Sequence, residues 1–84
     1  MQMIVYHAVM RARGTAEHAV LQVRWGEASP HGIHELCNSA IIAAQVGPLD
    51  MEITLTGEGK ESMAHQLTGR LARLAEEGIV VRVR

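Results

Sequence analysis

Residues 29–45, SPHGIHELCNSAIIAAQ, constrain the fold most, because their apolar residues follow the period of an α-helix. These residues recur at spacings of three and four, at Leu36, Cys37, Ala40, Ile41 and Ala44. Pro30 and Gly32 mark a loop before the helix, and Gly47 followed by Pro48 ends it. The pattern predicts a helix of about three turns that begins near His34.

His34 is predicted to lie at the start of this helix. The first N–H groups of a helix have no internal partner, and the helix dipole makes that end positive. The position therefore suits an anion, including a phosphoryl group carried on the imidazole ring itself. A loop histidine without a function is the alternative, because histidine is common in polar turns.

Two runs of alternating apolar and polar residues precede the helix. In residues 1–13 one face of the run carries Ile4, Tyr6, Ala8, Met10 and Ala12. In residues 18–25 one face of the second run carries Ala19, Leu21, Val23 and Trp25. The link at 14–17 contains a glycine, so the pattern predicts a β-hairpin. A helix remains the alternative for residues 1–13, because residues 3–6 are apolar on every side.

The chain after the helix continues with alternation at residues 51–56, which predicts a strand. Residues 57–59 are expected to form a hairpin turn and residues 60–63 a short returning strand. Leu67, Leu71 and Leu74 share one face of a second helix, which Gly78 closes before a last strand at 79–84. Arg11, Arg13, Arg24, Arg82 and Arg84 are expected on the helix-free face of the sheet. The order β-β-α-β-β-α-β predicts an α+β open-faced sandwich, with an antiparallel sheet and two helices on one face.

Length and composition limit the function. At 84 residues the chain is expected to form one domain, and a net charge of −1 with only Tyr6 and Trp25 aromatic argues against nucleic-acid binding. The single cysteine, Cys37, excludes an internal disulfide and fits a reducing compartment. No basic segment leads into a long apolar run, so we expect neither a leader nor a membrane span, and a cytoplasmic protein.

Residues 20–84 resemble HPr, the histidine-containing phosphocarrier family of the bacterial sugar phosphotransferase system. The segment 30–34, PHGIH, is similar to the family loop whose histidine accepts the phosphoryl group. The segment 53–56, ITLT, with Gly59 and Lys60 resembles the second strand and its turn, and Gly69 and Gly78 bracket the second helix at the family spacing. The resemblance implies a single HPr-like domain over 1–84, with 1–18 as an N-terminal extension and 19–84 as the core.

The resemblance implies a phosphoryl carrier rather than an enzyme, without a cofactor. His34 would accept the group, the backbone amides of Leu36 and Cys37 would hold it, and donor and acceptor proteins of the phosphotransferase system would be the partners. Leu36, Gln66 and Leu67 would form the docking surface.

The sequence departs from the family at several positions. Leu36 and Cys37 replace an arginine and a proline, Glu35 adds a repelling charge, and Gln66 replaces a regulatory serine. The resemblance implies a third helix after the last strand, and the sequence stops at Arg84. The extension is expected to add an edge strand or to cover the open face, and as an edge strand it could mediate a homodimer.

Two further functions remain open. His31, His34, Cys37 and His65 are expected at one end of the domain, where nitrogen and sulfur ligands suit zinc or copper. The alternative explanation of Cys37 is buried packing. A degenerate HPr-like interaction module without phosphoryl transfer is the other possibility.

Overall fold

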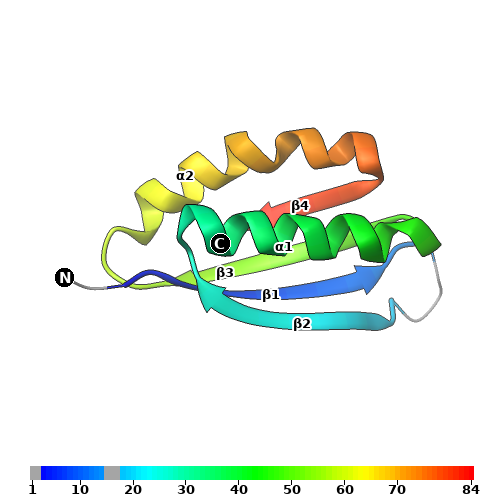
Figure 1. The fold of residues 1–84 in the computed structure, drawn as a ribbon, viewed down its shortest axis with the longest axis horizontal. Coiled ribbons are helices and arrows are strands. Elements are labelled where there is room, and N and C mark those ends of the chain that lie inside the picture. Colours follow the sequence, from blue (N-terminus) through cyan, green and yellow to red (C-terminus); the bar gives the residue numbers. More distant parts are fainter. Residues whose placement is uncertain (1–2, 15–17) are drawn as a thin grey trace.

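A computed structural model describes residues 3–14 and 18–84 (Figure 1). The elements of these residues are β1 (Val5–Ala12), β2 (Val20–Glu27), α1 (Pro30–Ala43), the 3₁₀ turn η1 (Ala44–Val46), β3 (Leu49–Thr56), α2 (Lys60–Leu71), the 3₁₀ segment η2 (Ala72–Glu77) and β4 (Ile79–Val83). The central helix and the strands at both ends of the chain are confirmed. The predicted turn at 14–17 lies mainly outside the described residues.

The described strands form one sheet in the order β2-β1-β3-β4. β1 runs antiparallel to β2 and β3, but β3 and β4 are parallel. The sheet is therefore mixed, and the prediction of an antiparallel sheet is wrong. The parallel pairing results from α2, which connects β3 to β4. A helical crossover between neighbouring strands of a sheet joins parallel strands. Both helices cover one face of the sheet, as expected for a small α+β sandwich (Figure 1).

β1 lies in the interior of the sheet. Val5 pairs with Glu27 of β2 on one side and with Thr56 of β3 on the other, and the double pairing continues along the strand. The first alternating run is thus a strand and not a helix. It is neither an added edge nor a cover, so the expectations of a peripheral extension and of a free edge at the N-terminal strand are wrong.

The core lies between the sheet and the helices. Its fully buried large side chains alternate along the strands and recur every three or four residues along the helices: Tyr6, Met10, Leu36, Leu49, Met51, Ile53, Leu55, Leu67 and Ile79. Alternation and helical period therefore identified the buried faces of β1, α1, β3 and α2 correctly.

The predicted returning strand at 60–63 is wrong, because α2 already begins at Lys60. Gly59 precedes the helix in the left-handed region, with φ 84°. Half-buried Met63 continues the buried face of Leu67 and Leu71 one turn earlier. A period of four residues therefore outweighs the short alternation that suggested a hairpin.

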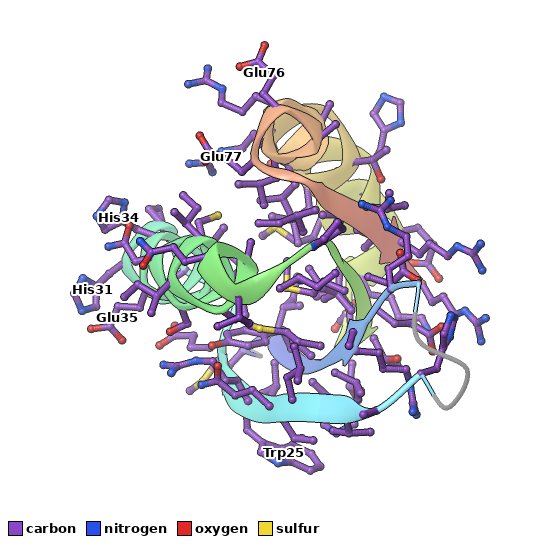
Figure 2. All side chains as sticks on the ribbon, turned by 90° about the vertical axis from the view of Figure 1, so that its right-hand side faces the viewer. Trp25, His31, His34, Glu35, Glu76 and Glu77 are labelled. Atoms are coloured by element: carbon purple, nitrogen blue, oxygen red, sulfur yellow. The ribbon has the colours of Figure 1, made fainter. Side chains whose placement is uncertain are left out.

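The face of the sheet without helices has an apolar part and a charged part. Along β2 it exposes apolar side chains, with Trp25 71% exposed, and Figure 2 shows Trp25 pointing away from both helices. Along β3 and β4 it carries charges, including an ion pair of 3.5 Å between Arg84 and Glu52. Arg24 is half-buried on the helix side, so its predicted place on the open face is wrong.

The helices of the described residues are too short, or too polar, to cross a membrane.

Candidate functional site

α1 begins four residues before His34. Ser29 is the N-cap, and its hydroxyl oxygen accepts a hydrogen bond of 3.0 Å from the Gly32 amide, while its carbonyl accepts one of 2.9 Å from the Ile33 amide. Pro30 occupies the first helical position, where its missing N–H costs nothing. His34 therefore lies in the second turn, and the prediction that it begins the helix is wrong.

The phosphate-holding role predicted for the amides of Leu36 and Cys37 is also wrong. Both amides lie inside α1, where a backbone N–H bonds to the carbonyl four residues earlier. Gly32 has a packing explanation instead of a phosphate-binding one. A Cβ at this position would collide with the backbone carbonyl oxygen of Glu27, so only glycine lets the first turn of α1 approach the end of β2 this closely.

The side of α1 that carries His34 borders a groove of about 390 Å³ against α2 and η2, which we call the α1–α2 groove. Its apolar wall includes Ile33 and Leu71. Its polar side chains come from α1, α2 and η2: His34, Cys37, Asn38, Arg70 and Arg73. The groove therefore combines an apolar wall with groups that can hold a negative charge.

The His34 ring is exposed and hydrogen-bonded along its own helix. Its Nε2 lies 3.3 Å from Asn38 Nδ2, which donates when the ring carries its proton on Nδ1. Glu35 does not line the groove, and its Oε1 lies 3.1 Å from His31 Nε2. Figure 2 shows His31 and Glu35 on the outer side of α1, away from α2. The repelling carboxylate expected beside His34 is thus turned to the solvent.

Two arginines on the opposite wall supply the positive charge. Arg70 lies in the last turn of α2 and Arg73 in η2, and both are exposed. Within the described part of the chain neither forms an ion pair or a hydrogen bond. Burial raises the pKa of the Cys37 thiol, and the positive charge of Arg70 partly offsets this rise. The Arg70 charge therefore lies close enough to act on Cys37, which also lines the groove.

Neither arginine was recognised from the sequence as a site residue. A signal was present, because each arginine is directly next to a buried leucine, Leu71 or Leu74, and so lies at the border of the buried face. Only the packing of α2 beside α1 determines which border meets His34.

The remaining predicted site residues are not assembled into one site. Leu36 and Leu67 have no exposed surface, so their predicted docking role is wrong and core packing accounts for both. Gln66 is exposed on α2.

The structure also separates the metal ligands considered above. His34 and Cys37 line the groove, whereas His31 pairs with Glu35 and His65 is exposed on α2. Among residues 3–14 and 18–84, no three His, Cys, Asp or Glu side chains lie close enough to hold a metal ion.

Comparisons with protein-family models, with curated proteins and with solved structures find no match for this chain.

Proposed function

We propose that this chain is an interaction module without catalytic activity, and that its α1–α2 groove binds an anionic, phosphoryl-bearing group on a cytoplasmic partner. The observation that carries the proposal is the convergence of His34, Arg70 and Arg73 on one groove. Guanidinium groups form short, charge-assisted hydrogen bonds with phosphate oxygens. The apolar wall offers surface to the group that carries the phosphate.

The charges around the groove favour this ligand over a cation. Its lining contains two arginines and no carboxylate. Glu76 and Glu77 follow the arginines on η2 but are not part of the lining. Since the net charge of the whole chain is only −1, binding would depend on this local arrangement and not on bulk attraction.

The test is an NMR titration of the ¹⁵N-labelled chain with phenyl phosphate, which has one phosphoryl group and one apolar ring. We expect saturable shifts at His34, Asn38, Arg70 and Arg73. Arg70→Gln and Arg73→Gln should each weaken binding about tenfold, because a hydrogen bond to a charged group contributes about 1.5 kcal/mol or more.

Arg82→Gln is the matched control, because Arg82 is an exposed arginine of the open face. Its binding should be unchanged. Equal weakening in all three variants would reduce the interaction to general charge attraction, and shifts outside the groove would contradict the proposal.

The second candidate is the HPr-like phosphocarrier, and the exposed ring of His34 favours it. In this mechanism Nε2 attacks the phosphorus of a phosphohistidine on a donor protein. A new P–N bond forms on His34, the P–N bond of the donor breaks, and Nδ1 keeps its proton. Arg70 and Arg73 would take the charge-neutralising role of the family arginine that Leu36 replaces.

Incubation with phosphoenolpyruvate, the general phosphotransferase and its donor chain tests the carrier mechanism. An acid-labile phosphoryl adduct, seen by mass spectrometry and lost in His34→Ala but kept in His31→Ala, would support it. Saturable binding of phenyl phosphate without an adduct would leave the interaction module as the function.

A further inference from the structure

The α1–α2 groove is longer than a phosphoryl group alone requires. Its volume of about 390 Å³ falls within the usual range of pockets for organic ligands, roughly 300–1,000 Å³. On α1 its lining runs from Ile33 to Ile41, which is about 12 Å along the helix at 1.5 Å per residue. A bound phosphoryl group by itself would leave much of this length unfilled.

On the wall formed by α2 and η2, positive charge lies above buried apolar residues. Arg70 and Arg73 are exposed, and each is followed directly by a buried leucine. Leu71 is 3% exposed and Leu74 5%, and both line the groove. This wall therefore offers cationic groups at its rim and apolar surface at its base.

The opposite wall, on α1, adds apolar surface that a ligand can reach. Ile41 and Cys37 both line the groove, and both are half-buried. Burial raises the pKa of the Cys37 thiol and the Arg70 charge partly offsets this rise, so the Arg70 guanidinium also lies close to this wall. A ligand whose charge is held by the arginines is therefore near apolar side chains of both walls.

We propose that the phosphoryl-bearing group is a phosphotyrosine side chain of the partner, with its phosphate at Arg70 and Arg73 and its ring against Ile41. This inference rests on the proposed function and specifies the ligand of the same groove. In phosphotyrosine the phosphate is bonded directly to an aromatic ring, so one side chain supplies both the charge for the rim and the apolar surface for the base. Arginine suits both parts, because a guanidinium bonds phosphate oxygens and also stacks on aromatic faces.

Other side chains match only part of the lining. Phosphoserine and phosphothreonine carry no ring, so they would leave Ile41 without apolar contact. The imidazole ring of phosphohistidine is smaller and polar, and it gains less from the same surface. An unmodified tyrosine would cover the apolar part but would leave Arg70 and Arg73 uncompensated, and neither forms an ion pair within residues 3–14 and 18–84.

The test compares phenyl phosphate with methyl phosphate, two phosphomonoesters that differ in the ring. At about pH 8, well above the second phosphate pKa near 6, both are dianions, so the charge attraction is the same. We expect NMR titration of the ¹⁵N-labelled chain to give phenyl phosphate an affinity about tenfold higher, because partial burial of an aromatic ring contributes at least that much. Nuclear Overhauser contacts should join the ring protons to the methyl groups of Ile41.

Ile41→Ala separates the two parts of the ligand. It should lower the affinity for phenyl phosphate about threefold to tenfold and leave the affinity for methyl phosphate unchanged. Retained binding of methyl phosphate also shows that the variant is folded. Ile42→Ala is the matched control, because Ile42 is the next residue of the same helix, is 66% exposed and is not part of the groove lining. It should change neither affinity.

Short glycine-flanked peptides test the source of the ring. A peptide with phosphotyrosine should bind about tenfold more tightly than one with phosphoserine, and a peptide with unmodified tyrosine should show no saturable binding. Binding of phenyl phosphate but not of the phosphotyrosine peptide would overturn the inference and indicate a free aryl phosphate as the ligand.

Equal affinities for phenyl phosphate and methyl phosphate would overturn the inference but leave the proposed function, because the groove would then recognise the phosphoryl group alone. Absence of binding by both compounds would overturn the proposed function as well. An equal loss of phenyl phosphate affinity in Ile41→Ala and Ile42→Ala would place the ring outside the groove and contradict the inference.

Discussion

At the scale of single residues, neighbours on α1 have opposite roles. Leu36 is completely buried beneath the helix, whereas His34 and Asn38 are exposed beside the groove. Leu36→Ala should lower the free energy of unfolding by about 2–5 kcal/mol through lost burial and the cavity that remains. Urea denaturation measures this loss.

Ile42→Ala is the control for that measurement. Ile42 lies on the same helix but is 66% exposed, so its truncation should change stability by about 0.5 kcal/mol or less. Equal losses in the two variants would contradict the placement of Leu36 in the core.

Cys37 provides a prediction of pH dependence. Only the thiolate reacts with alkylating agents, and burial raises the pKa of Cys37. Alkylation near pH 8 should therefore be slower than for a free cysteine, and its rate should keep rising into more alkaline solution. Arg70→Gln should slow it further, because the arginine charge lowers this pKa.

The same shift has a consequence for stability. An unfolded chain releases the thiol proton at lower pH than the folded chain, so the folded state loses stability as pH rises above the ordinary cysteine pKa. Arg82→Gln serves as the control for alkylation, and a rate unaffected by Arg70→Gln would exclude the electrostatic contact.

At the scale of the elements, two glycines of the α2 region distinguish the effect of backbone conformation on stability from the effect of helix propensity. Gly59 has a positive φ of 84° before the helix, while Gly69 lies inside it without a positive φ, and a Cβ would meet no atom at either position. Gly59→Ala should cost about 1–2 kcal/mol from left-handed strain. Gly69→Ala should stabilise by about 0.5–1 kcal/mol.

Thermal unfolding of the two variants tests whether these stability changes have opposite signs. Shifts of the melting temperature in the same direction would be inconsistent with an α2 that begins directly after Gly59.

Periodicity predicted the elements better than their connections. The buried faces of α1, β3 and β4 follow from their own residues. The start of α2 did not follow from its own residues. The glycines at 57–59 are equally typical of a hairpin turn, and residues 60–63 are too few to show a helical period. The parallel pairing of β3 with β4 depends on that missed helix turn.

Long-range placement was beyond sequence reasoning. The interior position of β1 depends on its pairing with β3, across the whole of α1. The approach of Arg70 and Arg73 to His34 likewise depends on helix packing, which no local pattern encodes. The sequence therefore singled out a histidine that borders the α1–α2 groove, but not the side chains that surround it.

At the scale of the whole molecule, residues 1–18 cannot be a dispensable extension. They contribute β1, without which β2 has no neighbour in the sheet. A fragment of residues 19–84 should therefore fail to fold, with weak circular dichroism and no cooperative unfolding. A chain of residues 3–84 is the control and should fold normally. A cooperative transition in the shorter fragment would contradict the central role of β1.

The interior position of β1 also imposes an order on synthesis. As the chain leaves the ribosome, β1 and β2 emerge before the strand that completes their sheet, and Tyr6, Ala8 and Met10 have no cover until later residues follow. Pairing between distant segments is slow to form. The nascent hairpin thus passes through a stage with a bare apolar side, at which chaperones that recognise such surfaces would bind it.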